Sequence, residues 1–200
     1  MKVIGIAGPS GSGKSTLARH LATEPGVVHL DADALAWATY APGGPAYFPL
    51  VARFGEDILA EDGTVDRARL ARVAFATPQA KADLEAIVHP RVMDEVRRAI
   101  ERHRDAGTRI LLVEGALLLA SPDVDRSLFD AVLWLEVPEE ERRARLLDSG
   151  LDRKAVARRL RAQRDLVPPQ DPRVYAVDGR GEPQEVAERV AELLRAWGGP

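Results

Sequence analysis

The chain has 200 residues, a formal net charge of −3 at pH 7 and no cysteine. A chain of this length forms one compact domain, or a core that carries a smaller insert. The lack of cysteine excludes disulfides, thiolate catalysis, cysteine zinc sites and iron–sulfur clusters. The slightly acidic balance disfavours a dedicated nucleic-acid-binding protein, which needs a concentrated basic face.

The sequence gives no signal for a histidine metal site, a signal peptide or a membrane span. The four histidines are scattered and form no HExxH pair. The longest apolar run, Ile110–Ala120, is interrupted by Glu114 and is shorter than the ~20 residues of a membrane span. We therefore expect a cytoplasmic protein that binds neither membrane nor nucleic acid.

The N-terminal part predicts a strand, a glycine-rich loop and a helix. Lys2–Ala7 is an apolar, β-branched run, and Lys14–Ala22 places its leucines on one helical face. A second strand is predicted at Val27–Leu30, ending at Asp31. The proline- and glycine-rich stretch Tyr40–Pro49 predicts a loop.

The middle of the chain is predicted to be helical. From Val51 to about Arg104 the apolar residues follow helical spacing without a strong strand pattern, and Pro78 and Pro90 punctuate the region. This stretch is too long for a simple crossover between two strands. It therefore predicts an inserted helical subdomain.

Strand and helix patterns alternate in the second half. The predicted strands are Arg109–Val113, Ala131–Val137 and Val174–Val177. Three helices are predicted: one with Pro138 in its first turn, one over Asp152–Arg164 and one that begins at Pro183. Short apolar strands that alternate with helices predict an α/β fold, with a mostly parallel sheet covered on both faces.

The segment between the first strand and the first helix carries the clearest motif. Gly8–Ser15 reads GPSGSGKS and fits the phosphate-binding loop GxxxxGK[ST] at every fixed position. Glycines let the loop amides point inward at a phosphate chain, and the following helix adds the positive end of its dipole. Lys14 supplies a charge to the β- and γ-phosphates, and the Ser15 hydroxyl is a Mg²⁺ ligand. The motif predicts a nucleoside triphosphate but no particular acceptor.

Several carboxylates are candidates for the acceptor side and the metal side. A kinase of small molecules needs a carboxylate to orient or deprotonate the acceptor hydroxyl, and Asp31 and Asp33 follow the second strand at the ligand edge of the sheet. The alternative is that both are helix caps. Glu114 follows the third predicted strand, where it is either part of the magnesium shell or a solvated strand-end charge.

Arginines concentrate in the two helices after Pro138. One or two of them are expected to close over the transferring phosphoryl group, with Arg145 and Arg159 favoured, while most form surface ion pairs. His89, next to Pro90, is either a ligand contact or a structural histidine at a helix start. The residues alone favour the structural role.

Beyond the loop, an ordered series of segments resembles the dephospho-coenzyme A kinase family. The segments run in the family's order along almost the whole chain, from Val3 to about Trp197. They are LDADALA (Leu30–Ala36), RFGEDILAEDGTVDRARL (Arg53–Leu70), VAFATPQAKADLEAIVHPRV (Val73–Val92) and SGLDRKAVARRLRAQ (Ser149–Gln163).

The resemblance implies a three-layer P-loop kinase fold with a five-stranded parallel sheet, a helical acceptor-binding insert and a lid. Residues 1–33 and 106–200 would form the nucleotide-binding core, including a lid at about 138–165, and residues 34–105 the insert. The implied reaction transfers phosphate from ATP, with Mg²⁺, to the ribose 3′-hydroxyl of dephospho-coenzyme A. The implied partners are these two substrates, bound by a monomer or weak homo-oligomer.

The resemblance also assigns site residues. It places the catalytic aspartate at Asp33 and acceptor contacts at Arg67 and His89. The nucleotide-binding residues that it implies are Gly11, Ser12, Gly13, Lys14, Ser15 and Thr16.

Two other functions stay open. The opening VIGIAGPSGSGKST and the Glu114-Gly115 segment are closer to uridine kinases, which favours a uridine-kinase-like nucleoside kinase as the alternative. A nucleotide-dependent regulatory module without transfer activity is the third hypothesis, and the intact Lys14, Ser15 and Asp33 disfavour it.

Overall fold

The computed structural model describes residues 1–115, 124–164 and 166–197. Contacts divide the chain into two compact units. The first takes in Met1–Asp31, Ile100–Pro122 and Arg126–Pro200, and the second takes in Ala32–Ala99 and Asp123–Asp125. The functional division at 33/34 and 105/106 into a nucleotide-binding core and an acceptor-binding insert stays a prediction.

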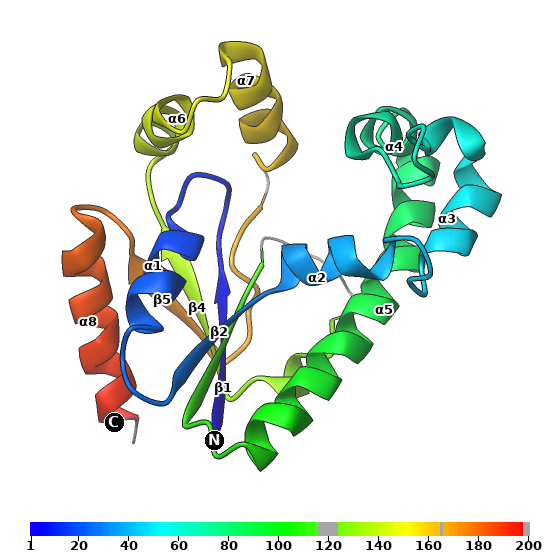
Figure 1. The fold of residues 1–200 in the computed structure, drawn as a ribbon. Coiled ribbons are helices and arrows are strands. Elements are labelled where there is room, and N and C mark those ends of the chain that lie inside the picture. Colours follow the sequence, from blue (N-terminus) through cyan, green and yellow to red (C-terminus); the bar gives the residue numbers. More distant parts are fainter. Residues whose placement is uncertain (116–123, 165, 198–200) are drawn as a thin grey trace. The chain divides into compact units, whose positions relative to one another are not determined.

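The first unit is built on a five-stranded parallel sheet with the strand order β2-β3-β1-β4-β5 (Figure 1). The strands are β1 (Lys2–Ala7), β2 (Val27–Asp31), β3 (Ile110–Glu114), β4 (Ala131–Glu136) and β5 (Val174–Asp178). The central strands β1, β3 and β4 are buried almost throughout, as expected of strands covered on both faces. The predicted α/β class and five-stranded parallel sheet are confirmed.

The helices of the first unit are α1 (Lys14–Leu21), α6 (Glu139–Asp148), α7 (Arg153–Ala162) and α8 (Pro183–Ala196), with a short 3₁₀ turn η2 (Arg126–Leu128). The helices come after the carboxyl ends of its strands: α1 after β1, α6 and α7 after β4, and α8 after β5. Local residues fix where two of these helices begin. Asp152 caps α7 by accepting hydrogen bonds from the amides of Lys154 and Ala155. Pro183 occupies the first position of α8.

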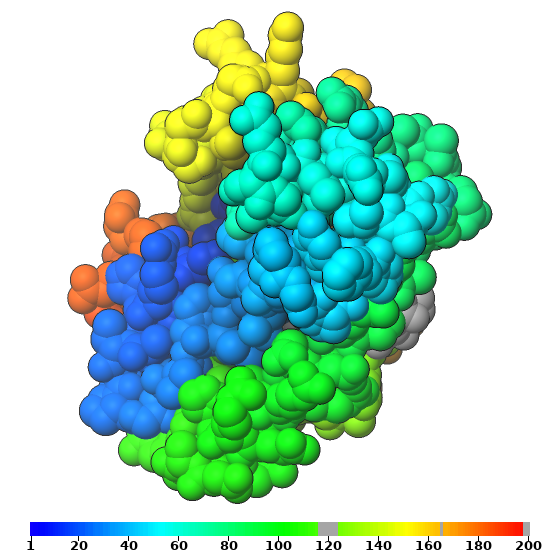
Figure 2. Space-filling model, turned by 45° about the vertical axis from the view of Figure 1, so that its right-hand side comes forward, coloured from blue at the N-terminus to red at the C-terminus, as the bar shows by residue number. Residues whose placement is uncertain are grey.

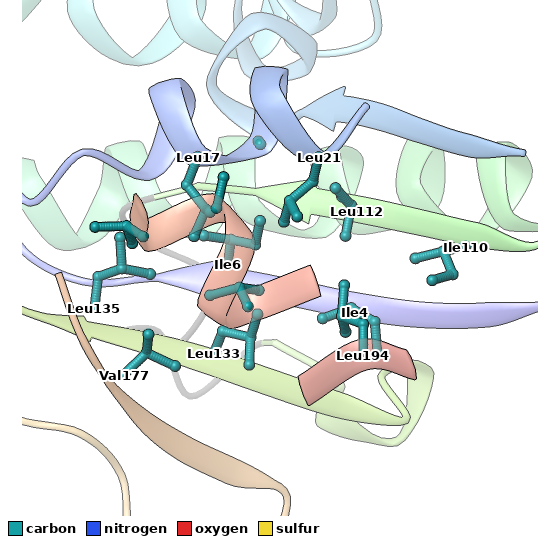
Figure 3. Close-up of a cluster of buried hydrophobic side chains, with 14 of the residues drawn as sticks. Ile4, Ile6, Leu17, Leu21, Ile110, Leu112, Leu133, Leu135, Val177 and Leu194 are labelled. Atoms are coloured by element: carbon teal, nitrogen blue, oxygen red, sulfur yellow. The ribbon is translucent and has the colours of Figure 1, made fainter. Parts of the chain in front are cut away.

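One hydrophobic cluster joins the sheet to α1 and α8 (Figure 3). In this cluster Ile4 and Ile6 of β1 pack with Leu17 of α1 and Leu194 of α8, and all four side chains are buried. Burial of a side chain of this size stabilises the fold by roughly 1.5–3 kcal/mol. The cluster therefore fixes the strand before the glycine-rich loop and the helix after it.

The second unit is helical. Its elements are α2 (Ala32–Thr39), α3 (Tyr47–Phe54), the 3₁₀ turn η1 (Glu56–Ile58), α4 (Arg67–Ala74) and most of α5 (Pro78–Asp105). Figure 2 shows one face of its surface, with α2 to α4 in blue to blue-green. Large apolar side chains remain exposed here, namely Trp37, Phe48 and Phe75. Among the helices of the described ranges, none is both long and apolar enough to cross a membrane.

Two proline-based predictions need correction. The predicted loop Tyr40–Pro49 is confirmed from Tyr40 to Ala46, but its end is wrong because α3 begins at Tyr47. Pro49 lies in the first turn of that helix, where the missing proline N–H costs no intrahelical bond. Pro90 does not interrupt the middle region, since it lies inside α5, a single helix of 28 residues from Pro78 to Asp105. Buried residues on both sides, Val88 and Val92 among them, hold the helix together across this position.

Candidate active site

The glycine-rich loop connects the end of β1 to the start of α1, as the sequence predicted. Gly8, Gly11 and Gly13 all have positive φ, at 140°, 82° and 92°. At Gly11 a Cβ would lie 2.7 Å from the carbonyl oxygen of Arg142, so any larger residue there meets both backbone strain and a clash. The loop thus has the glycines that its conformation requires.

A pocket of about 580 Å³ opens beside this loop. This volume falls in the ~300–1,000 Å³ range of small-molecule sites. The loop and α1 contribute residues 11–17 and Arg19, and α6 with its C-cap contributes Arg145, Leu146 and Ser149. The segment before α8 and the first turn of α8 contribute Gly179, Gly181, Glu182, Pro183 and Val186. All six predicted nucleotide-binding residues, together with Arg145, are therefore brought together. Arg159 is exposed on α7 and is not among the described residues that line this pocket.

Lys14 is the most buried cation of the pocket, with 8% of its surface exposed. Its Nζ donates a hydrogen bond to the carbonyl oxygen of Pro9 at 3.2 Å, which folds the side chain back over the loop. A largely desolvated ammonium at a helix N-terminus makes this end of the pocket attractive to an anion.

Arg145 adds a second cation. Its guanidinium donates to the carbonyl oxygens of Ser12 at 3.3 Å and Gly179 at 3.0 Å, and it lies 3.6 Å from Glu141. These contacts place the charge between the loop and the segment before α8.

Glu114 lies under the loop at the end of β3, opposite Ile6 of β1 and Asp31 of β2. Its Oε2 accepts a hydrogen bond from Ser15 Oγ at 3.1 Å and lies 3.7 Å from His29 Nε2. Only 3% of Glu114 is exposed, so the interpretation as a solvated strand-end charge is wrong.

The charge state of Glu114 follows from two opposing effects. Burial alone would raise the pKa of Glu114, but its contacts with His29, Lys14 and Ser15 outweigh that effect and hold the pKa below its ordinary value. Glu114 is therefore an ionised carboxylate beside the Ser15 hydroxyl.

We expect Glu114→Gln to destabilise the protein at neutral pH by about 1.5–3 kcal/mol, the range for hydrogen bonds to a charged group. Because the pKa of folded Glu114 lies below the ordinary value of 4.5, the contribution of the ionised group is complete above 4.5 and is lost at lower pH. Measured from about pH 6 to about pH 3.5, the difference in Tm between parent and variant should be nearly constant at first and should narrow once the pH falls below about 4.5. A difference that stays constant over this range would contradict the assignment.

The second unit holds the other predicted residues. Asp33 lies in the first turn of α2, because that helix begins directly after Asp31, and not at the strand end as predicted. Arg67 opens α4, and its guanidinium lies 3.6 Å from the ring centroid of Trp37. Burial raises the pKa of Tyr40, while Arg67 lowers it and Asp33 raises it further. Asp33 and Arg67 are thus both within electrostatic reach of Tyr40.

Comparison with known proteins covers nearly the whole chain. The family model described as dephospho-CoA kinase matches residues 2–168. A dephospho-CoA kinase of Corynebacterium jeikeium is 37% identical over 200 residues, which is 100% of both chains. One of Corynebacterium efficiens is 42% identical over 161 residues, which is 80% of this chain and 79% of that one.

This chain belongs to the dephospho-CoA kinase family. It is therefore a phosphotransferase with an alcohol acceptor, of the family that converts dephospho-CoA to CoA. The matches support this family and not the uridine-kinase-like alternative. The crystal structure of TT1252 from Thermus thermophilus superimposes with a TM-score of 0.75 at 31% identity, covering 98% of this chain and 96% of that one. A dephospho-CoA kinase from Campylobacter jejuni, at 17% identity and a TM-score of 0.55, shares the fold.

His89 does not lie where the sequence of this kinase predicted. It was expected at a helix start beside Pro90, yet it lies inside α5 with 7% of its surface exposed. The reason is that Pro90 does not end the helix. Its role as an acceptor contact stays a prediction.

The sequence did not single out two side chains of the kinase that hold the loop. Gln163 Oε1 accepts a hydrogen bond from the amide of Ser10 at 2.6 Å, and Arg142 Nη1 donates to the Ser10 carbonyl at 3.4 Å. Arg142 stood in the arginine cluster and Gln163 ended a segment of the family resemblance, but neither signal pointed to Ser10.

Proposed function

We propose that the chain performs the dephospho-CoA kinase reaction as one in-line transfer of the γ-phosphoryl group of ATP to the ribose 3′-hydroxyl of dephospho-CoA. The observation that carries this mechanism is the pocket of about 580 Å³ lined by consecutive loop residues from Gly11 to Thr16. Backbone amides and the N-terminus of α1 supply donors and a positive dipole to the triphosphate.

Two cations support the transfer on the nucleotide side. Lys14 neutralises negative charge on the β- and γ-phosphates, and its burial strengthens that attraction because little water screens it. Arg145, in the wall of the same pocket, is the first lid arginine of the proposal. Arg159, exposed on α7, is the second.

The residues beside the loop fit a magnesium ion. Mg²⁺ prefers oxygen ligands and is usually held by one or two carboxylates, water and substrate phosphates. Ser15 offers a hydroxyl, and Glu114 offers an ionised carboxylate 3.1 Å from it. We propose that Ser15 holds the ion and that Glu114 accepts hydrogen bonds in its shell. When bound, the ion would neutralise charge on the phosphates.

The acceptor side is assigned to the second unit. Asp33 orients the 3′-hydroxyl, and Arg67 and His89 contact the acceptor. The 3′-oxygen forms a bond to the γ-phosphorus as the bond from phosphorus to the leaving oxygen of ADP breaks. Asp33 accepts the hydroxyl proton late, because the transition state is loose. The enzyme is proposed to act as a monomer or weak homo-oligomer.

An acceptor panel tests the proposal. The full-length protein is incubated with Mg²⁺ and ATP labelled at the γ-phosphate, in separate reactions with dephospho-CoA, uridine or no acceptor. We expect label in CoA and little in uridine. Preferential labelling of uridine would overturn the acceptor assignment, and ATP binding without transfer to either compound would support the regulatory alternative.

A further inference from the structure

The backbone of Ser10, in the glycine-rich loop, is held from outside the loop at both its N–H and its carbonyl oxygen, which belong to two successive peptide groups. Its N–H donates to Gln163 Oε1 at 2.6 Å, and its carbonyl accepts from Arg142 Nη1 at 3.4 Å. These side chains come from the C-terminal end of α7 and from α6, the two helices beyond the loop in Figure 1. The mechanism above uses neither contact.

Arg142, which donates to the Ser10 carbonyl oxygen, is itself held in place by other contacts. It is 8% exposed, and its Nε donates to the carbonyl of Val137 at 3.1 Å. Burial lowers the pKa of its guanidinium, and Glu139 only partly offsets that effect. A buried guanidinium that donates to backbone carbonyl oxygens has little conformational freedom, unlike the guanidinium of an exposed surface arginine.

The glycine-rich loop needs contacts from outside to hold one conformation. Glycines flank Ser10 at positions 8, 11 and 13, all in conformations with positive φ, and glycine leaves the backbone the largest freedom. Within the loop, Ser10 is bridged by a single backbone hydrogen bond, from the amide of Ser12 to the carbonyl of Pro9 at 3.2 Å. Phosphoryl transfer depends on reacting groups placed within a fraction of an ångström.

We propose that Gln163 is a positioning residue for phosphoryl transfer, which fixes the Ser10 peptide from the end of α7 and so sets the conformation of the nucleotide loop. The inference rests on the proposed function of that loop. The side-chain oxygen of Gln163 is the required group, because the Ser10 N–H can only donate. Gln163 thereby acts on the reaction through the loop, without a contact to substrate.

Paired variants test this role. Gln163→Met keeps the side-chain length and removes the acceptor, whereas Gln163→Glu keeps an acceptor oxygen at the same distance, and a carboxylate accepts at least as strongly. We expect kcat at saturating ATP and dephospho-CoA to fall about tenfold in Gln163→Met, as loss of one well-placed hydrogen bond does. We expect Gln163→Glu to keep kcat within about threefold of the parent.

The matched control is Gln184→Met on the exposed face of α8, where Gln184 donates a hydrogen bond to Glu188. It should leave kcat unchanged. A merely structural Gln163 would lower Tm, or raise the KM for ATP, with kcat intact. Equal kcat in the parent and both Gln163 variants, or equal loss in both variants, would overturn the proposal. If the parent itself fails to phosphorylate dephospho-CoA, the proposed function falls instead, and binding of ATP to the three proteins by calorimetry still reports on the loop.

Discussion

Replacement of Lys14 by alanine is expected to lower kcat/KM by on the order of 10²–10³, the usual cost of removing one charge-stabilising donor from a transition state. The variant should also bind ATP more weakly, because Lys14 is 8% exposed and lies in the wall of the loop pocket. Steady-state kinetics with both substrates, together with ATP titration by calorimetry, measure the two effects separately.

Lys81→Ala is the matched control for Lys14. Lys81 pairs with Glu85 on the surface of α5, with 54% of its side chain exposed, so this variant should keep the parent's kinetics. If Lys14→Ala retained both ATP affinity and turnover, the assignment of the loop as the triphosphate site would be wrong.

The second large effect is expected for Asp33→Asn. Asparagine keeps the shape of the side chain but accepts no proton, and loss of a general base costs about 10²–10⁴ in rate. The late proton transfer of a loose transition state places the expected loss in kcat at about 10²-fold. The KM for ATP should change little, because in the proposed mechanism Asp33 acts on the acceptor hydroxyl and not on the nucleotide.

Asp57→Asn, at an exposed aspartate of the same helical unit, serves as the control for Asp33. It should leave kcat and Tm unchanged. Parent-like turnover in Asp33→Asn would remove Asp33 from the mechanism, whereas a low kcat with a parent-like Tm would confirm a chemical role.

The parts of this protein that the sequence predicted well are those with local causes. Residues 2–21 are an example. A β-branched run there predicts a strand, the three glycines and the lysine that follow it predict a phosphate-binding loop, and a helical pattern comes next. The structure contains all three elements. The alternation of short apolar runs with helical patterns likewise predicted the parallel sheet. Each of these signals acts within a few residues of the chain.

The errors have causes that lie outside the local pattern. The sequence pattern around Pro90 predicts a helix boundary, but buried residues on both sides of it keep α5 continuous. The predicted position of His89 at a helix start was wrong for the same reason. The hydrogen bond between Ser10 and Gln163 joins residues 153 positions apart in the sequence, and the hydrogen bond between Ser15 and Glu114 joins residues 99 positions apart. No spacing rule reports such contacts, because they form only when the sheet brings distant segments to one edge.

The central claim is that the loop pocket delivers the γ-phosphoryl group of ATP to one hydroxyl of dephospho-CoA. Phosphorus NMR of a reaction with the purified full-length chain, Mg²⁺, ATP and dephospho-CoA measures this directly. We expect ADP and a new ribose 3′-phosphate resonance to appear in equal amounts, and Lys14→Ala to abolish both within the time of the experiment. Release of inorganic phosphate with unchanged dephospho-CoA, or phosphorylation at another position of the acceptor, would contradict it.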